Sequence, residues 1–222
     1  MPVSALNFHL DSAECEARAT GAAVLRDAAV REDGSVPPGL RVLENFVTEA
    51  EEAELLRRLD AEGAWRASTF SGSNHSQMWG ARPDWGGRTV RKPDPAKGER
   101  EMPEWLDFIV ERFQRAHPSL SAWWANQCNA NEYVRSRGDF LRPHFDDRRL
   151  AGEIIVNVCL ASDCVMTFAR PNSSVEYRVP LPRRAASVMS RAARWDFTHE
   201  IKREDFLGER RVSLNFRQAP AP

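Results

Sequence analysis

The residues most able to support chemistry lie in one short segment, from Arg142 to Asp147, where a histidine and an aspartate are one residue apart. His144 and Asp146 alternate as they would on a β-strand, so both side chains are expected on the same face. A second histidine, His199, lies further along the chain in another stretch with the pattern of a strand end. Two histidines and one carboxylate leave three positions of an octahedron open, which is typical of non-haem Fe(II) oxygenase sites.

Arginines and polar side chains elsewhere strengthen this interpretation, because a histidine–aspartate pair alone also serves ordinary hydrogen bonds. Arg211 and Arg217 have an even separation on a predicted strand, which places both guanidinium groups on one face. Asn131 and Tyr133 share a face of the strand that enters the metal motif. Since guanidinium pairs with carboxylate in a bidentate manner, the pattern predicts a small dianion between the two arginines and near the metal.

The elements that must position these residues are mainly β-strands in the second half of the chain. Two helices are expected before them, one from the capping box Thr48–Glu51 to about Ala61 and one from Pro103 to about Ala116. The short strands, separated by turn residues, predict an antiparallel sandwich or jelly roll. The predicted strands are residues 40–46, 126–133, 153–160, 165–170, 175–179, 185–190 and 211–217.

The segment from Trp65 to Arg100 is rich in Gly, Ser, Asn, Arg and Trp and has no clean period. Long irregular segments in compact domains are often functional, so we expect a lid loop over the substrate. Its tryptophans alternate with cations, which makes Trp79 and Arg82 candidate substrate contacts, because such residues can stack bases and hold phosphates. The alternative is that the tryptophans pin the loop to the core and the cations face water.

Length and composition are those of a globular protein with one domain. The 222 residues are 42% hydrophobic and 28% charged, which is enough chain to bury a core. Residues 1–38 are Ala-rich and acidic, and we expect a loosely ordered extension there, followed by the domain at residues 39–222. The four cysteines form no paired motif, and no signal peptide or membrane span is evident. We therefore expect an intracellular protein, cytoplasmic or nuclear, that acts as a monomer.

The combined pattern N-x-Y, H-x-D, H and R-x5-R resembles that of the AlkB family of Fe(II)- and 2-oxoglutarate-dependent dioxygenases. The resemblance covers about residues 40–218, and the segments Gln127–Asn129, Pro143–Asp147 and Gly152–Glu153 are most similar to the fourth AlkB-homologue subclass. It implies an α+β fold of mainly β structure: a double-stranded β-helix with the N-terminal helices packed on one sheet. It also implies Fe(II) and 2-oxoglutarate as cofactors, with O2 as co-substrate.

The resemblance implies roles for individual residues. His144, Asp146 and His199 would hold Fe(II), and Arg211 would pair with the distal carboxylate of 2-oxoglutarate, helped by the Tyr133 hydroxyl. The other residues implied to contact 2-oxoglutarate are Arg217, Asn131 and Ser213, with Asn129 as a rival for the role of Asn131.

Three positions depart from the family pattern. Arg148 lies two residues after the metal aspartate, where the base-repair members carry an acidic residue. This departure weakens a role in repair of ring-methylated bases and makes Arg148 a candidate substrate contact. Arg191 and Glu200 stand where related sequences commonly have glycine, and either could reshape the pocket.

The expected reaction is oxidative N-demethylation, in which an N-methyl carbon is hydroxylated and released as formaldehyde, with succinate and CO2 as the other products. The subclass resemblance favours methyl-lysine in protein or N6-methyladenine in nucleic acid as the substrate. The chain after Glu62 carries more Lys and Arg than Asp and Glu, which is compatible with a nucleic-acid partner. Two alternatives remain: stable hydroxylation, and a non-catalytic binding module that retains the fold.

Overall fold

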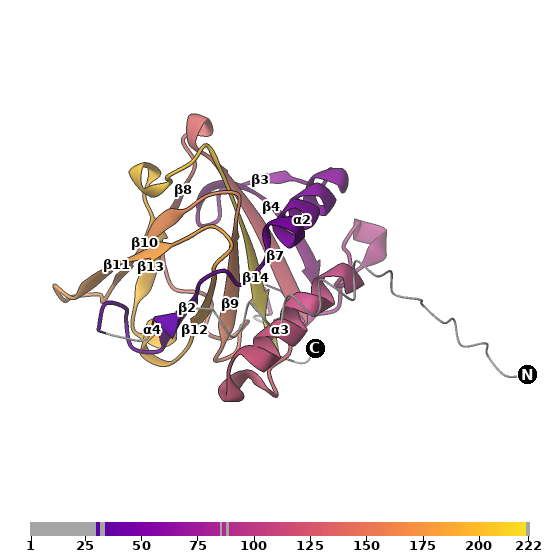
Figure 1. Cartoon of the computed structure of the whole chain (residues 1–222). Helices are drawn as coiled ribbons and strands as arrows, with labels where there is room; N and C mark the ends of the chain where they lie inside the picture. Colours follow the sequence, from indigo (N-terminus) through magenta and orange to yellow (C-terminus); the bar gives the residue numbers. More distant parts are fainter. Residues whose placement is uncertain (1–29, 32–33, 85, 88, 221–222) are drawn as a thin grey trace, which may run out of the picture.

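The structure, a computed structural model, describes residues 30–31, 34–84, 86–87 and 89–220. Most of the predicted N-terminal extension therefore lies outside the described residues. Two antiparallel sheets face each other at the centre of the described chain (Figure 1). This arrangement confirms the predicted jelly roll.

The larger sheet carries the helices on its outer side, and the smaller sheet lies opposite its inner side. The first residues of β4, Gly72 and Ser73, pair with β8 and join the two sheets. In spatial order the larger sheet contains β1 (Val30–Arg31), β2 (Leu40–Leu43), β12 (Ala186–Met189), β9 (Ile155–Leu160), β14 (Arg210–Arg217), β7 (Gln127–Val134) and β4 (Gly72–Gly80), with β3 (Arg66–Ser68) paired to β4. The smaller sheet contains β8 (Phe140–His144), β13 (Thr198–Ile201), β10 (Cys164–Ala169) and β11 (Glu176–Leu181).

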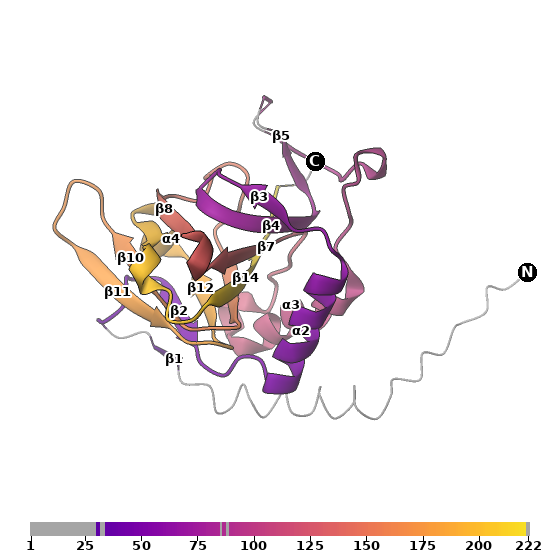
Figure 2. The ribbon, with the colours of Figure 1, turned by 90° about the horizontal axis from the view of Figure 1, so that it is seen from above.

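Two helices, α2 (Glu49–Ala61) and α3 (Asp107–Ala116), cover the outer face of the larger sheet (Figures 1 and 2). The predicted capping box is present: the Glu51 amide donates to Thr48 Oγ1 over 3.2 Å, and the Thr48 amide donates to Glu51 Oε2 over 2.8 Å. Arg112 of α3 is buried and joins the two helices, because it donates to Glu51 Oε2 over 2.8 Å and to the Phe46 carbonyl over 2.7 Å. In the described part of the chain, no helix is long and apolar enough to cross a membrane.

The predicted irregular loop between Trp65 and Arg100 contains regular structure, which corrects the sequence-based interpretation. Residues 72–80 form the long strand β4, which pairs with β7, and a small hairpin follows from β5 (Arg82–Asp84) and β6 (Thr89–Arg91). The sequence did not show that β4 is a strand, because two of its cavity-facing side chains, Asn74 and Ser76, are small and polar. Another tryptophan and another cation of this segment, Trp85 and Arg88, lie outside the described residues.

Trp79 belongs to the hydrophobic core, so its predicted role as a substrate contact is wrong. The side chain is 1% exposed. Its ring packs edge-on against Trp105, with centroids 6.0 Å apart, and the Arg100 guanidinium lies 4.6 Å from its centroid. The physical reason is the alternation of β4, which directs Trp79 toward the helices and its neighbour Met78 toward the cavity.

Candidate active site

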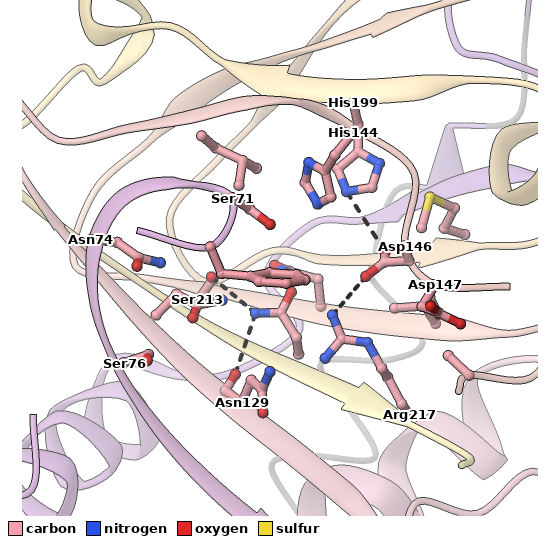
Figure 3. Close-up of a pocket in the computed structure, with 18 of the residues that line it drawn as sticks. Ser71, Asn74, Ser76, Asn129, His144, Asp146, Asp147, His199, Ser213 and Arg217 are labelled. Atoms are coloured by element: carbon pink, nitrogen blue, oxygen red, sulfur yellow. Dashed lines mark hydrogen bonds and ion pairs between the residues drawn. The ribbon is translucent and has the colours of Figure 1, made fainter. Parts of the chain in front are cut away.

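A cavity of about 380 Å³ lies between the two sheets and is lined by residues of both. On the larger sheet, every second residue of β7 and β14 faces it, as the pleat of a strand requires. The predicted site residues of the two strands share this face and lie close together, as Figure 3 shows for several of them. The residues of β7 and β14 that line the cavity are Gln127, Asn129, Asn131, Tyr133, Arg211, Ser213, Asn215 and Arg217.

The two histidines meet at the open side of this cavity. His144 is the last residue of β8, and His199 of β13 is its direct partner in the antiparallel ladder. Their ring centroids are 4.3 Å apart. Residues directly opposite each other in an antiparallel pair of strands have neighbouring side chains. The pairing of β8 with β13 therefore brings together two residues that are far apart in sequence.

Asp146 reaches the site by a different route from the one predicted. The strand ends at His144, so the alternation of His144 and Asp146 does not follow from a shared strand face. The carboxylate instead lies in the loop after β8, between the side chains of His199 and Arg217 (Figure 3). Arg217 Nη2 donates to Asp146 Oδ1 over 2.7 Å, and Asp146 Oδ2 lies 3.7 Å from His199 Nε2.

The electrostatics of the site keep Asp146 ionised and His199 neutral. Burial opposes ionisation of Asp146, but the positive charge of Arg217, aided by the two histidines, holds the pKa of this carboxyl well below its usual range. Burial, together with the nearby His144, lowers the pKa of His199 to about 3. His199 is therefore neutral at physiological pH and keeps a lone pair for a metal ion.

The tautomer of His144 is also fixed by its surroundings. His144 Nδ1 lies 2.9 Å from the Arg142 carbonyl oxygen, which can only accept, so Nδ1 carries the proton and donates. The lone pair is then on Nε2, as in metal-bound histidines whose other nitrogen is held by a carbonyl. Donor types and protonation states thus fit Fe(II), although among the described residues no group of three His, Cys, Asp or Glu side chains lies close enough together to hold an ion.

Arg211 marks the closed end of the cavity. Its side chain is 1% exposed, and no carboxylate of the described residues pairs with it. The guanidinium donates to the sulfur of Cys159, over 3.4 Å, and lies 5.7 Å from the ring centroid of Tyr133, while Nε has no partner. A buried cation without a counter-ion is unfavourable, so this end of the cavity is built to receive an anionic group.

Polar side chains occupy the floor of the cavity between Arg211 and the histidines. Asn215 Nδ2 donates to Ser213 Oγ and to the Asn129 carbonyl, each over 3.3 Å, whereas the buried Oδ1 of Asn129 has no partner. Asn131 and Asn129 both line the cavity, so the geometry keeps both as candidates for the same role. The sequence-based search missed Asn215. This residue lies two positions from Ser213 and two from Arg217, so strand alternation places its side chain on the same face as theirs.

The remaining substrate candidates, Arg82 and Arg148, do not line the cavity themselves. Arg82 is half-buried and donates to the Met78 carbonyl over 2.9 Å, and its guanidinium is not among the groups that line the cavity. Arg148 is exposed and lies over the ring of Phe145, 4.7 Å from its centroid, and Phe145 does line the cavity. Sequence reasoning missed Phe70, which is 69% exposed and lines the mouth, because an isolated phenylalanine gives no periodic signal.

A jelly roll that brings two histidines, an aspartate and a buried arginine to one cavity is typical of Fe(II)- and 2-oxoglutarate-dependent oxygenases. The family model of the 2OG-Fe(II) oxygenase superfamily matches residues 39–217 of the chain. Human alpha-ketoglutarate-dependent dioxygenase alkB homolog 4 is 29% identical and aligns with 91% of this chain and 74% of its own length. The DNA N6-methyl adenine demethylase of Caenorhabditis elegans is 28% identical and aligns with 86% of this chain and 64% of its own length.

The fold agrees with these matches. The solved structure of OsALKBH1 superimposes with a TM-score of 0.67 at 17% identity, and the match covers 86% of this chain and 100% of that one. The chain therefore belongs to the 2OG-Fe(II) oxygenase superfamily and, within it, to the AlkB family, as a 2-oxoglutarate-dependent dioxygenase with Fe(II) and 2-oxoglutarate as its cofactors.

Proposed function

We propose that this chain is an oxidative N-demethylase whose Fe(II) is held by His144, Asp146 and His199. In this proposal Arg211 would pair with the distal carboxylate of 2-oxoglutarate, helped by the Tyr133 hydroxyl, and Arg217 would lie near the keto-acid end. The other predicted co-substrate contacts, Asn131 or Asn129 and Ser213, line the floor of the cavity.

The observation that carries the proposal is the buried guanidinium of Arg211, in the same cavity as two histidines and an aspartate. A structural arginine at this depth would be expected to donate to carboxylate or carbonyl oxygens, as buried Arg112 donates to Glu51 and to the Phe46 carbonyl. Arg211 has no such partner among the described residues. A dicarboxylate that reaches from Arg211 toward the histidines would supply the missing charge at one end and ligand atoms at the other.

The chain's own residues prepare the site before any ligand binds. Arg217 keeps one oxygen of Asp146 engaged and leaves the other directed at His199, while the Arg142 carbonyl orients the His144 ring. Bound Fe(II) and 2-oxoglutarate supply the activation of O2, and the overall reaction gives succinate, CO2 and a hydroxylated substrate carbon. When that carbon is an N-methyl group, the hemiaminal that forms breaks its C–N bond to give formaldehyde and the N–H product.

The proposed substrate is an N-methyl group, and the surroundings of the cavity favour N6-methyladenine in nucleic acid over methyl-lysine in protein. Arg142, Arg148 and Arg149 flank the metal motif on the surface, and within the described chain none of them pairs with a carboxylate. Exposed arginines without acidic partners suit a phosphate backbone. The C. elegans relative, a DNA N6-methyl adenine demethylase by its name, supports the same substrate class.

One assay tests the proposal. The protein is purified without oxygen, supplied with Fe(II), 2-oxoglutarate and O2, and presented with N6-methyladenine DNA and RNA or methyl-lysine peptides, while succinate and formaldehyde are measured. We expect equal amounts of both products with N6-methyladenine, and none above background in His144→Ala. If only the methyl-lysine peptides give product, the substrate is methyl-lysine in protein and not N6-methyladenine in nucleic acid. Succinate without formaldehyde, with a substrate gain of one oxygen, would indicate stable hydroxylation, and no succinate with any substrate would refute the proposal.

A further inference from the structure

The carboxylate proposed to bind iron sits in a loop, so something other than strand pairing must fix its position. Asp146 lies in residues 145–154, between the end of β8 and the start of β9. Facing this loop is the five-residue helix α4 (Arg191–Trp195), which leads into β13 and His199. Packing between the loop and α4 therefore sets how the aspartate lies relative to the second histidine.

Arg194 of α4 is bound entirely to the loop that carries Asp146. Its side chain is 1% exposed. The two terminal nitrogens donate to the carbonyls of Asp146 over 3.0 Å and Asp147 over 2.8 Å, and weaker contacts of 3.3 Å reach those of Ala151 and Gly152. One planar guanidinium thus satisfies four backbone acceptors at both ends of the turn, which the single ammonium of a lysine cannot span.

Glu153 completes the contact in the opposite direction. Its Oε1 accepts from the Arg191 amide over 2.7 Å, and its Oε2 accepts from the Trp195 indole. Arg191 has a φ of +49°, in the left-handed region that a side chain rarely adopts. The hydrogen bond that the Arg191 amide donates to Glu153 holds this strained residue. Glu153 of the loop therefore contacts both ends of α4, while Arg194 of α4 contacts the loop.

We propose that Arg194 and Glu153 are positioning residues for the metal site, a clasp that fixes Asp146 against His199. This inference rests on the proposed iron site. Three observations support it: the carbonyl of Asp146 itself is an acceptor of Arg194, the guanidinium is fully buried without a carboxylate partner among the described residues, and α4 ends four residues before His199. A purely structural contact would stabilise the fold without changing how tightly a metal binds.

The test measures Mn(II) binding in place of Fe(II), by electron paramagnetic resonance and calorimetry without oxygen, together with thermal unfolding of the full chain. Groups that orient metal ligands typically contribute 10- to 100-fold to metal affinity. We expect Arg194→Lys to weaken Mn(II) binding by about this factor and to alter the absorption bands of bound Co(II). Arg112→Lys is the matched control, since Arg112 is equally buried and also binds a backbone carbonyl, but on the far side of the larger sheet.

The control separates positioning from stability. The proposal is overturned if Arg194→Lys binds Mn(II) as the wild-type chain does, or if Arg112→Lys weakens binding equally. If Arg194→Lys does not fold, Glu153→Gln and Trp195→Phe probe the same clasp from its other side: several-fold weaker Mn(II) binding in both supports it, and unchanged binding in both refutes it. Failure of the wild-type chain to bind Mn(II) would instead refute the proposed iron site, and the clasp with it.

Discussion

Replacing Arg211 with methionine tests the co-substrate site directly. Met fills most of the same volume but removes the buried charge. If the guanidinium pairs with the distal carboxylate of 2-oxoglutarate, the variant leaves that carboxylate buried and unpaired, which costs about 3–5 kcal/mol. Since about 1.4 kcal/mol corresponds to a factor of ten, the Kd for 2-oxoglutarate should rise by ~100-fold or more.

The same substitution should not destabilise the ligand-free protein. The Arg211 guanidinium has an unpaired Nε and no carboxylate partner within the described chain, so its removal relieves an unfavourable burial. By contrast Arg112→Met breaks a buried pair with Glu51 and should cost about 3–5 kcal/mol of folding free energy while leaving the Kd for 2-oxoglutarate unchanged. Arg211→Met should therefore weaken 2-oxoglutarate binding without loss of stability, whereas Arg112→Met should lower stability without weakening 2-oxoglutarate binding.

Calorimetry and thermal unfolding provide the measurements, with Mn(II) present and O2 excluded. At a 2-oxoglutarate concentration of about 100 times the wild-type Kd, binding stabilises the wild-type protein by about 2.7 kcal/mol. For a chain of this size that corresponds to a rise in Tm of roughly 5–10 °C, whereas Arg211→Met at the same concentration should show a rise of about 1 °C. A Kd within threefold of wild type, or a large loss of ligand-free stability, would refute the assignment of Arg211.

Three other results follow from the structure. Trp79→Ala should cost about 3–5 kcal/mol of folding free energy, measured by urea unfolding, because the ring is a core residue; wild-type stability would contradict that placement. Phe70→Ala should change the free energy of unfolding by less than about 0.5 kcal/mol but raise the KM for the methylated substrate, and an unchanged KM would exclude Phe70 from substrate binding. The metal-free protein should lose stability as the pH falls from 6.5 toward 3, because unfolded His199 takes up a proton in this range and folded His199 does not; His199→Gln should flatten that part of the profile.

The strands of the second half of the chain could be predicted from sequence because their inner and outer faces differ. In β14, Arg211, Ser213 and Arg217 alternate with the apolar Val212, Leu214 and Phe216, and the structure places the first set in the cavity and the second under the helices. Alternation of polar and apolar residues with a period of two indicates a strand with two different faces, as found here. The same rule failed for β4, because Asn74 and Ser76 on its cavity face are small polar residues that are typical of a loop.

The location of Asp146 shows where sequence reasoning stops. The H-x-D spacing singled out His144 and Asp146, and both line the cavity, but the shared strand face expected for them is absent because β8 ends before the aspartate. What brings the carboxylate to the histidines is tertiary contact: Arg217 from β14 and Arg194 from α4. The spacing of Arg217 predicted a place near the metal but not its contact with Asp146, and no pattern in the sequence connects Arg194 to Asp146.

The two ends of the cavity differ in a way that constrains the order of binding. Arg211 at one end is 1% exposed, and His199 beside the proposed iron is 8% exposed, whereas Phe70 at the mouth is 69% exposed. A dicarboxylate must pass the mouth and the histidines before it reaches Arg211. A macromolecular substrate held at the mouth would close that path, so 2-oxoglutarate is expected to bind first. The exposed mouth can then be shaped for the substrate without disturbing the buried arginine that holds the co-substrate.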